Sequence, residues 1–146
     1  MTDKPYRLLV TGSRDWTDEE LIRHQLTRAW LTVKGPFVVI HGGCPTGADW
    51  MASDWVANML EAEMGDVREE GHPAQRHPTE DFGPWPGAGP RRNAHMVGLG
   101  ADACLAFIGP CTKPNCRRPQ PHGSHGASGC ADLAEAAGIP TRRFTA

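Results

Sequence analysis

The sequence predicts an α/β domain of three layers, with helices on both faces of a central, mainly parallel sheet. Short apolar runs alternate with segments whose apolar residues recur at helical spacing, which is the pattern of βαβ units. Three glycine-rich turns, at residues 11–14, 41–49 and 123–129, each lie between a strand-like run and a helix-like run. We expect one domain, residues 1–146, because a chain of this length buries enough surface in a single core.

The first half of the chain predicts two strand-turn-helix units. Residues 7–11 are a short apolar run ended by glycine, which is typical of a buried parallel strand. Thr17 and Glu20 match a capping box, and the apolar residues after them recur at helical spacing. Residues 37–40 repeat the strand pattern, and residues 48–64 predict a second helix with an apolar face.

The second half continues the alternation of strands and helices, but its strand and turn signals are weaker. Residues 67–73 predict a more polar third strand, and the stretch from there to Pro90 is typical of loop. Pro90 then opens a helix over residues 91–100, because proline suits a first helical turn. The apolar run 103–108 predicts a further strand.

A Cys/His-rich insertion is predicted at residues 109–130, ahead of the last helix. That helix is expected over residues 129–137, with Ser128 as its cap and Gly138 as its end. Residues 140–144 predict a final edge strand.

Composition restricts the partners and the cellular compartment. The formal charge of −2 gives no general electrostatic reason to expect nucleic-acid binding. A polar N-terminal segment and the absence of a long apolar run predict a cytoplasmic protein with no membrane partner. Five cysteines without a secretory signal argue against a disulfide framework and favour metal binding or burial.

Four motifs in fixed order carry a resemblance to a known family. They are residues 10–16, 41–49, 89–96 and 129–133. Together they resemble the SLOG superfamily, specifically its YspA/YpsA-related branch, which is common in bacterial and phage genomes. This resemblance implies a Rossmann-like fold and a nucleotide-derived ligand. The superfamily also includes the LONELY GUY phosphoribohydrolases and a DNA-processing relative that binds single strands.

The resemblance leaves two functions open. In the phosphoribohydrolases a Gly-Gly-x-Gly-Thr turn is followed three residues later by a catalytic glutamate, and here Cys130 replaces the threonine and Leu133 the glutamate. Leucine cannot act as a general base. We therefore expect a binding module that senses or sequesters a signalling nucleotide. The alternative is a nucleoside-monophosphate phosphoribohydrolase-like enzyme that cleaves an N-glycosidic bond. In it, Arg91 or Arg92 would hold the phosphate, and Asp132, Asp49 or His41 would supply the acid–base chemistry.

The glycine-rich turns are expected to bind the anionic part of the ligand. Glycine lets a backbone approach a ligand closely, and a helix N-terminus offers free N–H donors. A tight turn with a solvated Arg14, and Asp49 stabilising its own helix, are the structural alternatives. The expected ligand-binding residues are Gly12, Ser13, Arg14, Gly42, Gly43, Thr46, Gly47, Asp49, Arg91, Arg92, Asn93, Ser124, His125, Gly126 and Ser128.

The insertion predicts a structural zinc site. It contains Cys111, Cys116, His122 and His125, four ligand types that zinc accepts, and few apolar residues that could anchor it to a core. Cys130 is an alternative fourth ligand. A crosslink by zinc would hold this loop as a lid beside the third turn.

A homodimer or higher even oligomer is expected. The predicted helix over residues 48–64 carries more large apolar side chains than one sheet contact requires.

Overall fold

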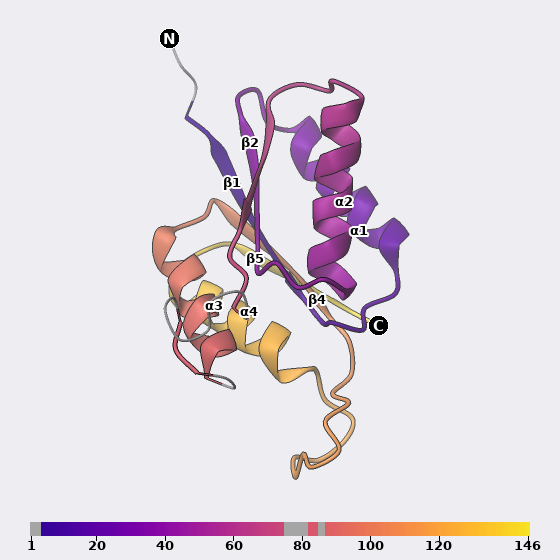
Figure 1. The fold of residues 1–146 in the computed structure, drawn as a ribbon, viewed down its shortest axis with the longest axis vertical. Helices are drawn as coiled ribbons and strands as arrows, with labels where there is room; N and C mark the ends of the chain where they lie inside the picture. Colours follow the sequence, from indigo (N-terminus) through magenta and orange to yellow (C-terminus); the bar gives the residue numbers. More distant parts are fainter. Residues whose placement is uncertain (1–3, 75–81, 85–86) are drawn as a thin grey trace.

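The computed structural model describes residues 4–74, 82–84 and 87–146 (Figure 1). Part of the predicted loop before Pro90 lies outside these ranges. Strands and helices alternate along the described chain. The strands are β1 (Tyr6–Gly12), β2 (Phe37–His41), β3 (Val67–Gly71), β4 (Ala103–Ile108) and β5 (Thr141–Thr145). The helices are α1 (Glu19–Leu31), α2 (Gly47–Glu61), α3 (Ala88–Leu99) and α4 (His125–Ala136).

The five described strands form one sheet in the order β3-β2-β1-β4-β5, and every pairing is parallel. Leu8 of β1 pairs with Val39 of β2, and Leu9 pairs with Cys104 of β4. The chain winds outward from β1 in both directions, so the order reverses between β1 and β4. In parallel α/β sheets this reversal leaves a crevice at the C-terminal edge of the strands, where ligands bind.

The helices make two further layers, with α1 and α2 on one face of the sheet and α3 and α4 on the other (Figure 1). Phe37 and Trp55 belong to the buried cluster under α1 and α2, while Leu9 and Met96 belong to the cluster under α3 and α4. The predicted three-layer, Rossmann-like α/β fold is confirmed, with a sheet that is parallel throughout its described strands. Within the described residues, no helix has both the length and the apolar content to cross a bilayer.

Two helices begin at other residues than the sequence predicted. The N-cap of α1 is Asp18, not Thr17, and its carboxylate accepts a hydrogen bond of 3.1 Å from the Leu21 amide. Helix α3 begins at Ala88, ahead of Pro90. Proline is tolerated there because the first amides of a helix have no intrahelical partner.

The last helix also begins earlier than predicted, so the insertion is shorter. Helix α4 starts at His125 with Ser124 as N-cap, not at Gly129 with Ser128 as cap. Most of the third glycine-rich turn, residues 125–129, therefore lies within the start of the helix, and the insertion comprises residues 109–124. Glycine lowers helix propensity, and packing against α3 and β4 outweighs that preference here.

Candidate functional site

The glycine-rich turns meet at the C-terminal edge of the sheet. Because each helix returns antiparallel to the strands, α2, α3 and α4 all begin at this edge (Figure 1). Their N-termini direct unpaired amides and positive dipole ends toward it. The edge thus has the electrostatic character that favours an anion.

Ser13 joins three segments at the point where the strand order reverses. Its hydroxyl accepts a hydrogen bond of 2.7 Å from the buried Gly109 amide and shares one of 2.6 Å with the Ser124 hydroxyl. Its own amide donates to the Phe107 carbonyl at 2.9 Å. Ser13 is buried, so this hydroxyl connects β1 with β4 and α4 and does not face solvent.

Glycines of the first two turns allow close approach of the protein's own segments. A Cβ at Gly12 would lie 2.2 Å from the Ala48 side chain, so this glycine lets α2 pack on the end of β1. Gly47 has φ +69°, and a Cβ there would lie 2.2 Å from the Ser13 carbonyl oxygen. The exposed Arg14 follows Ser13 in the turn after β1. Internal packing accounts for both glycines.

Arg92 lies at the centre of the predicted ligand-binding residues. Its Nη1 donates to the carbonyl oxygens of Gly42 at 2.6 Å and His72 at 3.3 Å, and its Nε donates to the Asn93 side chain at 2.7 Å. A Cβ at Gly42 would lie 2.4 Å from Arg92 Nη1 and 2.9 Å from Asp49 Oδ2. The bare glycine therefore makes room for a guanidinium and a carboxylate together.

Asp49 is buried, and Arg92 is half-buried. Burial raises the pKa of Asp49, while His41, the Cys44 amide and Arg92 oppose that rise. Burial likewise lowers the pKa of Arg92, and Asp49 is the main group that opposes it. The Asp49 carboxylate also accepts a hydrogen bond of 3.2 Å from the Cys44 amide. The pair forms a buried polar centre between the start of α2 and the start of α3.

Asn93 links this centre to α4, whereas Arg91 and Asp132 point elsewhere. The buried Asn93 side chain donates to the Gly126 carbonyl at 3.4 Å. Arg91 is exposed and donates to the carbonyl oxygens of Phe82 and Pro84. Asp132 is bound at 2.6 Å by Arg143 of β5. Within the described residues, Asp132 forms no ion pair or hydrogen bond with Arg91 or Arg92.

His41 has both ring nitrogens occupied. Its Nδ1 accepts a hydrogen bond of 3.0 Å from the Gly43 amide, so Nε2 carries the proton and faces the Glu69 carboxylate at 2.5 Å. Gly43 has φ +70° and lies against Pro73. These contacts make His41 a satisfied, buried histidine at the end of β2.

The first turns of α4 present an open surface. A Cβ at either Gly126 or Gly129 would meet no heavy atom within 4 Å. Ser124 turns its hydroxyl to Ser13 and does not cap the helix, and Ser128 lies close to Gly123. Thr46, the N-cap of α2, is exposed and likewise makes no capping hydrogen bond.

The insertion and the first residue of α4 bring four ligand-type side chains together. The ligand atoms of Cys111, Cys116, His122 and His125 all lie within 4.8 Å of one another. Cys116 Sγ lies 3.4 Å from Nε2 of each histidine, and the two Nε2 atoms are 3.1 Å apart. Cys130 is not part of this cluster, because it is buried in α4 beside Thr11.

The orientation of the histidines suits a metal ion. His122 Nδ1 lies 2.9 Å from the Pro119 carbonyl oxygen, to which it donates its proton, so the Nε2 lone pair is free to face the cluster. Desolvation and the positive charges of Arg118 and Lys113 lower the pKa of His125, which favours its neutral, ligating form. The Cys2His2 cluster is therefore able to hold a metal ion.

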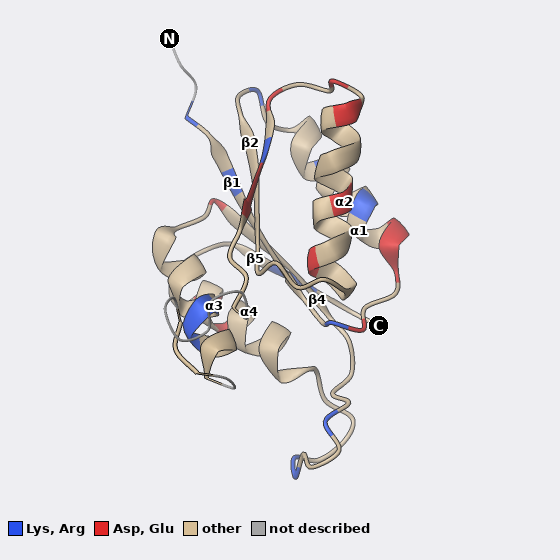
Figure 2. Cartoon of the chain, in the orientation of Figure 1, with Lys and Arg blue, Asp and Glu red and all other residues tan. Residues whose placement is uncertain are grey.

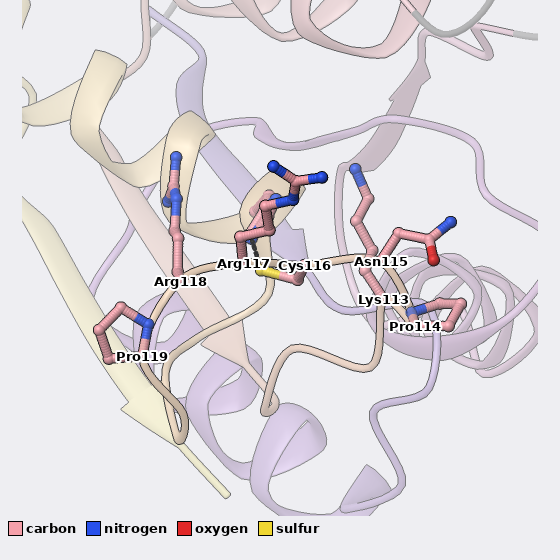
Figure 3. A pocket seen from close by; sticks show the side chains of 8 residues that line it. Lys113, Pro114, Asn115, Cys116, Arg117, Arg118 and Pro119 are labelled. Carbon is pink, nitrogen blue, oxygen red and sulfur yellow. Dashed lines mark hydrogen bonds between the residues drawn. The ribbon is translucent and has the colours of Figure 1, made fainter.

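A basic hollow of about 850 Å³ lies against the same loop (Figure 3). Cys116 and His125 line both the hollow and the cluster. The three cationic side chains that line it, Lys113, Arg117 and Arg118, rise from one side of the loop (Figure 3). None of these three cations was among the predicted site residues. The complete lack of acidic residues between positions 109 and 131 is the signal that could have found this surface.

A second charged group escaped sequence reasoning. Glu70 of β3 forms a two-pronged ion pair with Arg7 of β1 at 3.0 Å and also contacts His72 at 2.9 Å. Hydrogen bonds from Arg7 lower the pKa of Glu70 to about 2. Arg7 and Glu70 lie on β1 and β3, on either side of β2, so their proximity follows from the strand order and not from the sequence.

Comparisons with known proteins agree with this architecture. A model of the YspA, cpYpsA-related SLOG family matches residues 6–68, which contain β1 through the start of β3. The Gene 61 protein of Mycobacterium phage D29 is 36% identical over 141 residues, covering 94% of this chain and 95% of that protein. No solved structure matches the chain.

Proposed function

Because the chain belongs to the YspA, cpYpsA-related SLOG family, we propose that it binds a nucleotide or nucleotide-derived small molecule at the C-terminal edge of its sheet. Family membership itself indicates nucleotide-related binding or processing. Its role would be to sense or sequester a signalling nucleotide. The full-length match to a phage protein supports a phage-encoded origin.

One observation carries the location of the ligand. The first turns of α4 are open at Gly126 and Gly129, the Asn93 amide of α3 donates to the Gly126 carbonyl, and the Arg92 guanidinium in turn donates to the Asn93 side chain. Helix-terminal amides and a nearby guanidinium are the groups that hold phosphate in proteins. We therefore place the ligand phosphate between the N-termini of α3 and α4, rather than on the closely packed first turn.

Binding without cleavage is the better-supported role. Leu133, which stands where the phosphoribohydrolases have their catalytic glutamate, is 40% exposed and has no acid–base group. The neighbouring Asp132 is paired with Arg143. Release of free base from nucleoside monophosphates by the purified protein would favour the enzymatic alternative instead.

A substitution at Gly126 tests the proposed phosphate position. Gly126→Asp adds no steric contact, since the space around this residue is open, and a carboxylate in the first turn of a helix favours the folded protein. The same charge repels a bound phosphate. We expect Gly126→Asp to keep its melting temperature but to lose nucleotide-induced stabilisation.

The matched control is Gly126→Ala, which adds a methyl group without charge. It should retain the thermal shift seen across a panel of nucleoside mono-, di- and triphosphates. If Gly126→Asp is stabilised as strongly as Gly126→Ala, the phosphate does not lie at α4. If no nucleotide stabilises the wild-type protein and none copurifies with it, the binding function itself is wrong.

Zinc is the metal that best fits the Cys/His cluster. Tetrahedral zinc, with Zn–S of about 2.3 Å and Zn–N of about 2.05 Å, places sulfur and nitrogen ligands roughly 3.5 Å apart and two nitrogens roughly 3.3 Å apart. The corresponding distances here are 3.4–3.6 Å and 3.1 Å. Four protein ligands leave no open coordination position, so the zinc would be structural.

A further inference from the structure

The insertion carries positive charge that the protein does not neutralise. Lys113, Arg117 and Arg118 lie on it, and no acidic residue occurs between positions 109 and 131. Within the described ranges, none of these three side chains makes an ion pair or hydrogen bond. Figure 2 shows the basic segments on the protruding loop with no acidic segment beside them.

Zinc would not change this balance. Two cysteine thiolates would offset the charge of one divalent ion, and both histidines would bind in their neutral form. The three cations would therefore remain as the net charge of the loop. The crosslink would also fix the backbone from Cys111 to Cys116 and from Cys116 to His122. The cations on these segments would then keep a defined arrangement.

The hollow has the size and place expected for part of a nucleotide site. Its volume of about 850 Å³ exceeds what a single phosphate fills. It includes His125, the first residue of α4, so it adjoins the helix terminus at which the proposed phosphate lies. The loop leaves the sheet at the end of β4, where the strand order reverses.

We propose that this hollow binds a chain of two or more phosphates on the nucleotide-derived ligand, through Lys113, Arg117 and Arg118. The proposal rests on the proposed nucleotide-binding function and narrows the ligand to di- or polyphosphates. Two guanidinium forks and an ammonium group match several adjacent phosphate oxygens. Nucleic-acid recognition is less suited, because it draws on many phosphate contacts along an extended surface, and only one compact group of cations is present here.

Inorganic phosphates test the subsite without knowledge of the base. Using the zinc-loaded full chain, calorimetric titration should show tripolyphosphate binding roughly tenfold or more tightly than orthophosphate. The triple variant Lys113→Gln, Arg117→Gln, Arg118→Gln should lose this preference while retaining its zinc. Equal affinity of the wild-type protein for the two anions would overturn the proposal, as would unchanged tripolyphosphate binding by the triple variant.

A matched control removes the same charge from elsewhere. Lys4→Gln, Arg28→Gln, Lys34→Gln alters exposed residues near the opposite, N-terminal edge of the sheet. It should keep the preference for tripolyphosphate, and an equal loss would show that only net charge matters. A single-stranded DNA oligonucleotide that binds the loop more tightly than tripolyphosphate would also reject the proposal.

The two proposals fail in different ways. If nucleoside monophosphates bind and depend on Gly126 but tripolyphosphate gains nothing from the loop, only the polyphosphate subsite is wrong. If tripolyphosphate binds through the loop but no nucleotide binds more tightly than it, the subsite stands and the nucleotide function falls.

Discussion

A buried hydroxyl just after β1 connects this strand with the segments that follow β4 and precede α4. Ser13 bonds the Gly109 amide and the Ser124 hydroxyl, so it fixes both ends of the insertion against the sheet. Sequence reasoning expected this hydroxyl to contact a phosphate. The structure uses it to satisfy a buried amide, which is a requirement of folding whether or not a ligand is present.

We expect Ser13→Ala to reduce stability. The substitution leaves the buried Gly109 amide without its partner, which costs about 1–3 kcal/mol of unfolding free energy. Urea denaturation measures the loss. Thr17→Ala is the control, since Thr17 is exposed and does not cap α1, and its effect should stay within about 0.5 kcal/mol. A stable Ser13→Ala protein that no longer binds nucleotide would support the ligand-contact role instead.

At the scale of elements, the apolar runs predicted the strands more accurately than the glycine-rich segments predicted where the helices begin. Residues 103–108 are buried on both faces of the sheet, so their apolar run coincides with β4. The polar sequence of β3 gave a weak signal because β3 is an edge strand. The start of α4 was placed too late because Gly126 and Gly129 resemble a turn in sequence.

A glycine can make room either for the protein's own packing or for a surface open to solvent, and the sequence alone does not distinguish these two roles. Gly12 and Gly42 lie against the protein's own side chains, whereas Gly126 lies in open space. All three occur in glycine-containing segments that look alike in sequence, and only the tertiary packing shows which one has open space beside it. The Cys/His cluster was predictable, by contrast, because Cys111, Cys116, His122 and His125 are close in sequence as well as in space.

Removing zinc should unfold the insertion and leave the sheet intact. None of the residues between β4 and α4 belongs to a buried apolar cluster, so a bound metal would be the main source of order in this segment. With chelator, or in Cys116→Ser, trypsin should cleave the Arg117–Arg118 bond rapidly. The melting temperature should change little.

Metal analysis of the untreated protein should give about one zinc per chain. Cys44→Ser is the control, because Cys44 lies outside the cluster and should keep both the zinc and the resistance to trypsin. A metal-free protein whose Arg117–Arg118 bond resists trypsin would contradict a structural zinc.

On the scale of the whole molecule, the parallel sheet gathers the chemistry at one edge. Arg92 and Asp49 are far apart in sequence, yet the fold places both beside Gly42, near the starts of α3 and α2. The sequence indicated this edge through its strand-turn-helix order. It did not indicate which arginine turns inward, because Arg91 and Arg92 are adjacent and differ only in the helix face they occupy.

The layer formed by α1 and α2 offers a surface for self-association. Trp50, Leu60 and Met64, on α2 and just beyond it, are 47%, 53% and 45% exposed, while Trp55 of the same helix is buried against the sheet. Large exposed apolar side chains on one element are typical of interfaces. We therefore propose that α2 pairs with its copy in a homodimer or a higher even oligomer.

Trp50→Glu should dissociate that oligomer, because it places a charge in a contact that is apolar on both sides of a two-fold axis. Light scattering at micromolar concentration should give twice the 15.9 kDa chain mass, or a higher even multiple, for the wild-type protein and a monomer mass for the variant. Leu99→Glu alters an equally exposed apolar residue at the end of α3, on the other face of the sheet, and should leave the assembly unchanged. A monomeric wild-type protein would rule out self-association through α2, and loss of assembly in Leu99→Glu alone would move the interface to α3.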